Sequence, residues 1–78
     1  MTTRNVKPSV AESFRQLHIA QGRDYVERTL AGSLAYLVAS HTPVRFAGGI
    51  TQHCYTFTDG SHLTWTLGAD IDRMAIVV

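Results

Sequence analysis

The residues best suited to chemistry are four histidines, one cysteine and two aspartates near the C-terminal end. His53 and Cys54 are adjacent in a predicted β-strand, so their side chains point to opposite faces of the sheet and do not share one metal ion. His62 lies on the same face as Cys54 in the register derived below. This gives two ligands, whereas a structural zinc site needs four. We therefore expect no metal ion and no cofactor.

Cys54 is also a candidate nucleophile, with His62 across the strands as its base. An active thiolate needs a base within reach and an electropositive setting. A lone cysteine in a strand more often serves as a small apolar side chain. The sequence contains no Gly-x-Ser-x-Gly elbow, phosphate loop or dinucleotide fingerprint. We therefore expect a protein that is not an enzyme.

Asp70 and Asp72 place two carboxylates beside a predicted turn. Alternate acidic residues can bind calcium, but a calcium loop also needs a central glycine and a later glutamate, which are missing here. Aspartate side chains commonly accept hydrogen bonds from nearby backbone N–H groups in turns. We interpret the two residues as turn residues.

A predicted β-hairpin over residues 50–67 positions most of these side chains. Apolar and polar residues alternate on both sides of Asp59-Gly60, and this dipeptide is the strongest short-range hairpin signal. A two-residue loop would place the aromatic positions of one strand beside the threonines of the other. Such a register is unfavourable because a shift of one residue moves every side chain to the other face.

A three-residue loop, Thr58–Gly60, with glycine in the left-handed conformation removes this conflict. It pairs Tyr55 with Leu63 and His53 with Trp65. We predict this loop because it gathers the large apolar side chains on one face. That face comprises Tyr55, Phe57, Leu63, Trp65 and Leu67.

The N-terminal half predicts one or two helices. Ser9 and Glu12 have the spacing of a capping box, and apolar residues follow at helical spacing. Gly22 is a stop signal, although two helices and one long bent helix both fit the pattern. The second helical stretch is expected to end near Ser40, before Pro43. Its apolar stripe comprises Val26, Leu30, Leu34, Leu37 and Val38.

Short strands follow the helices, at Val44–Phe46, within the hairpin, and at Met74–Val78. This order predicts an α+β fold: one or two N-terminal helices packed on a three- to four-stranded antiparallel sheet, in αα-ββββ order. Residues 1–8 are expected to form a flexible arm and residues 9–78 a single domain. The expected core comprises Phe14, Leu17, Val26, Leu30, Leu34, Leu37, Phe46, Tyr55, Phe57, Leu63, Trp65, Leu67, Ile76 and Val78.

Composition narrows the class of protein. The chain has 78 residues, 45% of them hydrophobic, and a net charge of +1, which argues against disorder and against an obligate nucleic-acid or anionic-membrane partner. One cysteine cannot form an internal disulfide, which favours a reducing compartment. The first residues lack the apolar core of a secretory signal, and the longest apolar run, Leu34–Ala39, is too short to span a bilayer. We expect a cytoplasmic protein.

The favoured hypothesis is a small protein-binding module that occupies a partner's surface, the partner being a protein or a nucleoprotein complex. Phage-encoded inhibitors of host machinery, such as anti-CRISPR proteins, share this size and neutral charge. This analogy rests on size class and not on particular residues. Arginine and tyrosine are common interface anchors. The candidate partner-binding residues are Arg23, Tyr25, Arg28, Tyr36, Asp59, His62, Asp70 and Asp72.

Two alternatives stay open. A nucleic-acid-binding accessory protein would use the basic arm and helix, but acidic residues alternate with the helical arginines, and this ranks it below a protein partner. A structural homodimer would form through the apolar strand Ala75–Val78, or through the small-residue segment Ala31–Ala39.

Overall fold

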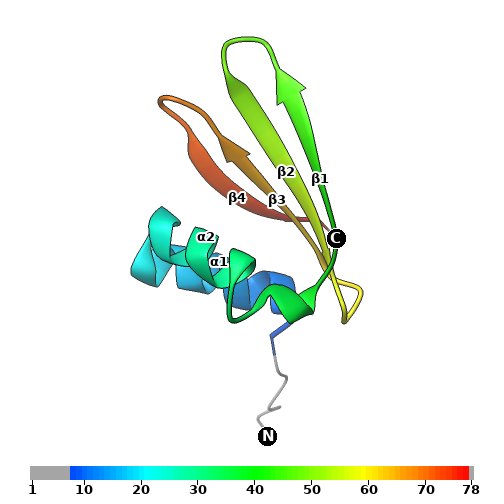
Figure 1. Cartoon of the computed structure of the whole chain (residues 1–78). Helices are drawn as coiled ribbons and strands as arrows, with labels where there is room; N and C mark the ends of the chain where they lie inside the picture. The colour runs from blue at the N-terminus through cyan, green and yellow to red at the C-terminus, as the bar shows by residue number, and fades with distance from the viewer. Residues whose placement is uncertain (1–7, 78) are drawn as a thin grey trace, which may run out of the picture.

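The computed structural model describes residues 8–77, in which two helices lie against one face of a four-stranded antiparallel sheet (Figure 1). This confirms the predicted α+β fold and its αα-ββββ order. Most of the predicted arm, residues 1–7, and the predicted core residue Val78 lie outside the described residues.

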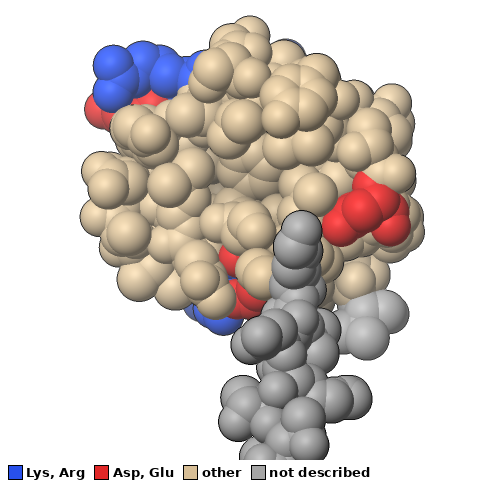
Figure 2. All heavy atoms as spheres, turned by 90° about the horizontal axis from the view of Figure 1, so that it is seen from below, with Lys and Arg blue, Asp and Glu red and all other residues tan. Residues whose placement is uncertain are grey.

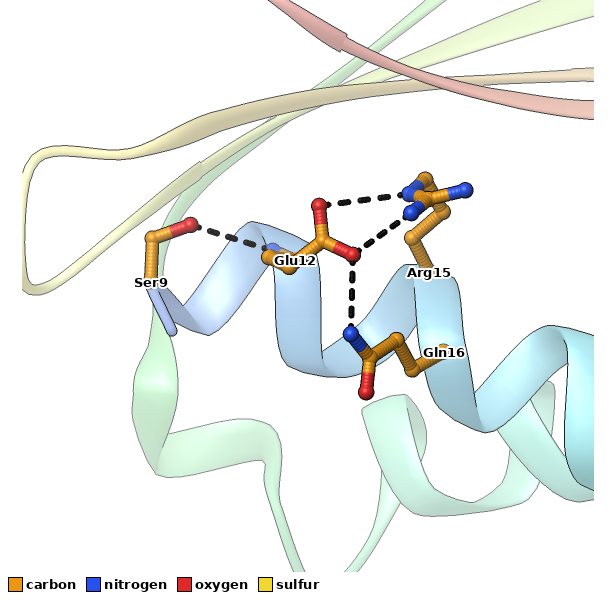
Figure 3. Close-up of polar contacts among 4 residues, drawn as sticks. All are labelled: Ser9, Glu12, Arg15 and Gln16. Atoms are coloured by element: carbon orange, nitrogen blue, oxygen red, sulfur yellow. Dashed lines mark hydrogen bonds and ion pairs between the residues drawn. The ribbon is translucent and has the colours of Figure 1, made fainter. Parts of the chain in front are cut away.

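The first helix, α1 (Val10–Gln21), begins at the predicted Ser9 cap, where Ser9 Oγ accepts a hydrogen bond of 3.1 Å from the Glu12 N–H (Figure 3). The Glu12 carboxylate accepts hydrogen bonds from Arg15 Nη2 at 2.6 Å and from Gln16 Nε2 at 3.1 Å. These bonds lower the pKa of Glu12, and the bond from Arg15 has the largest effect. The glutamate therefore pairs along the helix instead of completing a capping box.

Gly22 separates the two helices. Its φ of 87° is a conformation that glycine adopts without strain, and its N–H donates to the His18 carbonyl at 2.9 Å. The second helix, α2 (Arg23–Ala31), starts at the next residue. The chain therefore forms two helices and not one bent helix.

The predicted end of the second helix near Ser40 is wrong, because α2 ends at Ala31. Gly32 and Ser33 are weak helix formers, and the Leu34 N–H donates to the Thr29 carbonyl at 2.9 Å in a wider turn. The chain then continues through the 3₁₀ helix η1 (Ala35–Leu37). Leu34, Leu37 and Val38 consequently do not extend the stripe of α2.

The four strands follow in the spatial order β1-β2-β3-β4. They are β1 (Val38–Phe46), β2 (Ile50–Phe57), β3 (His62–Leu67) and β4 (Asp72–Val77). The predicted strand Val44–Phe46 is only the end of a longer β1, and the last strand starts at Asp72 instead of Met74.

The hairpin register is confirmed. Tyr55 pairs with Leu63 and His53 pairs with Trp65. The Phe57 N–H donates to the Ser61 carbonyl at 2.9 Å, and Gly60 has a φ of 86°. The loop therefore has three residues, with glycine in the left-handed position.

The core lies between the helices and the inner face of the sheet. Its buried residues are Ala11, Phe14, Val26, Leu30, Phe57, Leu63 and Trp65. Six further predicted core residues are partly buried against this cluster: Leu17, Leu34, Leu37, Tyr55, Leu67 and Ile76.

Phe46 was predicted in the core and is 53% exposed. It ends β1 at the β1–β2 loop, which lies far beyond the helices (Figure 1). No helix described here is long and apolar enough to cross a membrane.

Candidate functional site

The helices cover only part of the inner face of the sheet. The β1–β2 hairpin extends well past them (Figure 1), and an open cleft of about 570 Å³ lies between α2 and this hairpin. His41, His53 and Tyr55 form its floor, and Arg23 and Glu27 contribute from α2. We call this space the histidine cleft.

The register of β1 and β2 explains the floor of the histidine cleft. His41 pairs with Tyr55 across the two strands, and their rings stack with centroids 4.3 Å apart and planes 4° apart. His53 lies two residues from Tyr55 on the same face, and the two imidazoles share a hydrogen bond of 2.8 Å between His41 Nε2 and His53 Nδ1. The stack continues from Tyr55 to the core residue Phe57. The cleft floor is therefore connected to the packed core.

Two side chains of the floor of the histidine cleft have shifted pKa values. Burial, together with the neighbouring His41, lowers the pKa of His53 below its ordinary value of 6.5. Burial also raises the pKa of Tyr55. On α2, Arg23 Nε donates to Glu27 Oε1 at 2.7 Å. The cleft thus combines stacked rings with one ion pair.

A second hollow is an apolar groove of about 260 Å³. It lies between α1 and the segment 34–37 and is lined by Val10, Ser13, Phe14, Leu17, Leu34 and Leu37. Figure 2 views the molecule from the side on which the helices lie. Most of that face carries no charge, it is hollowed near its middle, and the charged groups lie towards its periphery.

Tyr36 lies in η1 between two residues that line the apolar groove, Leu34 and Leu37. Its side chain is 72% exposed. Of the eight predicted partner-binding residues, Tyr36 lies in the segment that forms one wall of the apolar groove, Asp59 contacts the groove residue Val10, and Arg23 lines the histidine cleft.

Asp59 holds the start of α1 against the β2–β3 loop. Its Oδ2 accepts a hydrogen bond of 2.9 Å from the Val10 N–H, and its Oδ1 accepts one of 3.0 Å from the Ser61 N–H. Ser61 Oγ accepts a further bond of 3.1 Å from the Ala11 N–H. The bonds from Ser61 and Val10 lower the pKa of Asp59. This carboxylate therefore has a structural role.

Asp72 does not have the predicted turn role, because its Oδ1 binds side chains from other elements. Trp65 Nε1 donates to this oxygen at 2.6 Å, and His18 Nε2 lies 2.8 Å from it. His62 bonds through Nδ1 to Thr56 Oγ1 at 2.9 Å. The structure therefore does not pair His62 with Cys54 as base and nucleophile.

The eight predicted residues are spread over several surfaces. Asp59 and His62 lie at one end of β3, and Asp70 and Asp72 lie at the other end. The structure therefore places these four residues in two pairs at opposite ends of the sheet. Tyr25 and Arg28 are exposed on α2.

Sequence reasoning missed His41. His41 was placed between the expected end of a helix near Ser40 and the expected strand Val44–Phe46, which hid its pairing with Tyr55. Within residues 8–77, no group of three His, Cys, Asp or Glu side chains is arranged to hold a metal ion.

Comparison with protein-family models, with curated proteins and with solved structures finds no match to this chain.

Proposed function

We propose that this protein is a small protein-binding module, and the observation that carries the proposal is the apolar groove between α1 and the segment 34–37, a segment that also holds the exposed Tyr36. Binding energy at protein interfaces is concentrated in aromatic anchors and in apolar pockets that exclude water. The groove supplies an apolar pocket, and the segment that forms one of its walls supplies an exposed aromatic ring, Tyr36. A partner would insert an apolar side chain into the groove and pack against the tyrosine ring.

The face around the apolar groove supports a protein partner. Charged residues are depleted at the centre of protein interfaces, and none of the six residues that line the groove is charged. The groove lies on the side of the molecule where the helix layer has no further cover among the described residues.

Two observations favour a protein over a nucleic acid. Arg15 and Arg23, which the alternative would use for phosphate contacts, are paired with Glu12 and Glu27 at 2.6 and 2.7 Å. Base stacking needs an exposed aromatic side chain, and the only tryptophan of the chain, Trp65, is 1% exposed.

More specifically, we propose a phage-encoded inhibitor that acts in the cytoplasm. Like an anti-CRISPR protein, it would occupy the surface of a host protein or nucleoprotein complex. The support for this more specific proposal is the small size and neutral charge of the chain. The partner-binding roles of Tyr25, Arg28, His62 and Asp70 stay predictions.

The test is capture from a host lysate on the immobilised protein, with and without nuclease, at two salt concentrations. We expect a defined protein to be retained in all four conditions by the parent and to be lost with Tyr36→Ala. Loss of the retained material on nuclease treatment, or a steep fall with salt, contradicts the proposal and favours nucleic acid, because phosphate contacts release counterions.

A homodimer is the second candidate, and the position of β4 favours it. Both β1 and β4 are edge strands, but β1 carries Pro43, and proline on an edge discourages pairing with another strand. β4 ends in apolar residues, with Val77 47% exposed. Light scattering tests this candidate: a dimer that becomes a monomer with Val77→Lys supports it, whereas a monomer at high concentration rejects it.

A further inference from the structure

His41 and His53 are joined by a hydrogen bond whose existence depends on their protonation. His41 Nε2 on β1 and His53 Nδ1 on β2 lie 2.8 Å apart. A neutral imidazole has one N–H donor and one acceptor nitrogen, whereas a protonated imidazole has two donors and no acceptor. The hydrogen bond therefore forms only while at least one of the two rings is unprotonated.

The pair can bind two protons, and these have opposite effects on the hydrogen bond. The first proton enters at the outer nitrogen of the ring that donates, and the bond becomes charge-assisted and stronger. The second proton enters at the bridging nitrogen of the ring that accepts, because the other nitrogen of that ring already carries a hydrogen. Two N–H groups on two positively charged rings then face each other, so the bond is lost and the rings repel.

The surroundings of the pair oppose the second proton. Burial, and after it the neighbouring His41, lowers the pKa of His53 below its ordinary value of 6.5. Glu27 of α2 acts in the opposite direction with a smaller effect, and its carboxylate is paired with Arg23 at 2.7 Å. Both rings are therefore protonated together only at acidic pH.

The other elements around the histidine cleft do not offset this repulsion. The remaining charged residues on the inner face of the described strands are Arg45 of β1 and Asp72 of β4. Arg45 adds positive charge, and the Asp72 carboxylate accepts a hydrogen bond from Trp65. Burial raises the pKa of Tyr55, so its phenol stays uncharged in acid, and β3 and the segment 35–38 line the cleft with uncharged side chains.

We propose that His41 and His53 form an acid-sensitive switch in the floor of the histidine cleft. While at most one of the two rings is protonated, their hydrogen bond joins β1 to β2 across the floor. When both are protonated, the rings separate and His41 leaves its stack on Tyr55.

His41 is the ring that moves, because it is exposed and lies on the edge strand β1, whereas His53 is partly buried on the inner strand β2. The change is local to the cleft. The stack of Phe14 on Phe57, with centroids 5.2 Å apart, lies in the buried core and involves no group that titrates. Acid should therefore alter the cleft floor and leave the core packed.

The test is nuclear magnetic resonance of the full chain labelled with ¹⁵N, in which the ring nitrogens of each histidine report its protonation from about pH 8 to about pH 5. We expect His41 and His53 to titrate in two coupled steps at least about one pH unit apart. The nuclear Overhauser contacts between the His41 and Tyr55 rings should disappear with the second step, and those between Phe14 and Phe57 should persist.

His41→Gln is the informative variant, because a glutamine amide can donate to His53 or accept from it and never carries a charge. His53 should then titrate in a single step, with a pKa higher than in the parent. His62→Gln is the matched control, since the His62 ring bonds to Thr56 on the opposite face of the sheet, and it should leave both steps unchanged.

The parent titration decides the proposal even if a variant fails to fold. Contacts between His41 and Tyr55 that survive protonation of both rings overturn it, as do two independent single steps for His41 and His53. Loss of the Phe14–Phe57 contacts in the same step also overturns it, because the acid transition would then be unfolding of the core and not a local change.

Discussion

Trp65 and Asp72 are joined by a hydrogen bond of 2.6 Å from the indole Nε1 to the carboxylate Oδ1, and His18 Nε2 lies 2.8 Å from the same oxygen. The three residues belong to β3, β4 and α1. One carboxylate oxygen therefore links the helix layer to the sheet beside the core.

Asp72→Ala should destabilise the fold by about 1–3 kcal/mol, because it leaves the N–H of the buried Trp65 without an acceptor. Urea unfolding measures the change. Asp70→Ala is the matched control, since Asp70 is an exposed carboxylate in the same turn, and we expect a change within about 0.5 kcal/mol. Equal effects of the two variants would show that the shared oxygen adds no stability.

Gly32→Ala should also destabilise the protein, by about 1 kcal/mol, although alanine is the better helix former. A β-carbon at this position would lie 2.9 Å from the Arg28 carbonyl oxygen, a backbone atom that cannot move aside cheaply. Ser33→Ala, at the exposed neighbouring position, is the control. A rise in the unfolding free energy of Gly32→Ala would contradict this packing.

The ionisation of Asp59 should make the stability of the folded protein depend on pH. Its pKa in the folded protein is below the ordinary value of 3.8, because Ser61 and the Val10 N–H bind the ionised form. Its contribution is therefore complete above about pH 4 and is lost as the pH falls through the lowered pKa. We expect the thermal midpoint of Asp59→Asn to fall less than that of the parent between pH 7 and pH 2. Parallel curves would contradict the assignment.

Glu12 also contributes to acid sensitivity, so it limits the difference between the parent and Asp59→Asn. Its pKa is lowered in the same direction by Arg15 and Gln16, so Asp59→Asn should keep part of the acid sensitivity. Combining it with Glu12→Gln should flatten the pH dependence further. The comparison separates the two carboxylates without requiring either one to account for the whole effect.

The local structure was predicted correctly from the sequence where side-chain alternation and turn chemistry agreed. In the hairpin, the odd-numbered aromatic residues and the left-handed preference of Gly60 both specified one register, and that register is observed. The Ser9 cap was found because its spacing to Glu12 is local. Both signals are contained in a few neighbouring residues.

The segment after Ala31 could not be predicted in the same way. Leu34, Leu37 and Val38 keep helical spacing, and short apolar runs do not distinguish helix from strand. The deciding contacts are nonlocal, among them the hydrogen bond of 2.9 Å from the Thr58 N–H to the Leu37 carbonyl.

The candidate sites depended on that same segment. Only when β1 starts at Val38 does His41 pair with Tyr55, and only when α2 ends at Ala31 do Leu34 and Leu37 form a wall of the apolar groove. The contacts of Asp59 with Val10 and of Asp72 with His18 were also out of reach, because they join residues 49 and 54 positions apart.

The most direct measurement is the affinity of the captured partner for Tyr36→Ala and for its control Ile19→Ala, by calorimetry on purified proteins. Ile19 is 69% exposed, nearly as much as Tyr36, but it lies about 200° around α1 from the groove residue Leu17. We predict at least about tenfold weaker binding for Tyr36→Ala, no change for Ile19→Ala, and unfolding free energies within about 0.5 kcal/mol of the parent for both. Parental affinity in Tyr36→Ala, or an equal loss in Ile19→Ala, would contradict binding through the apolar groove.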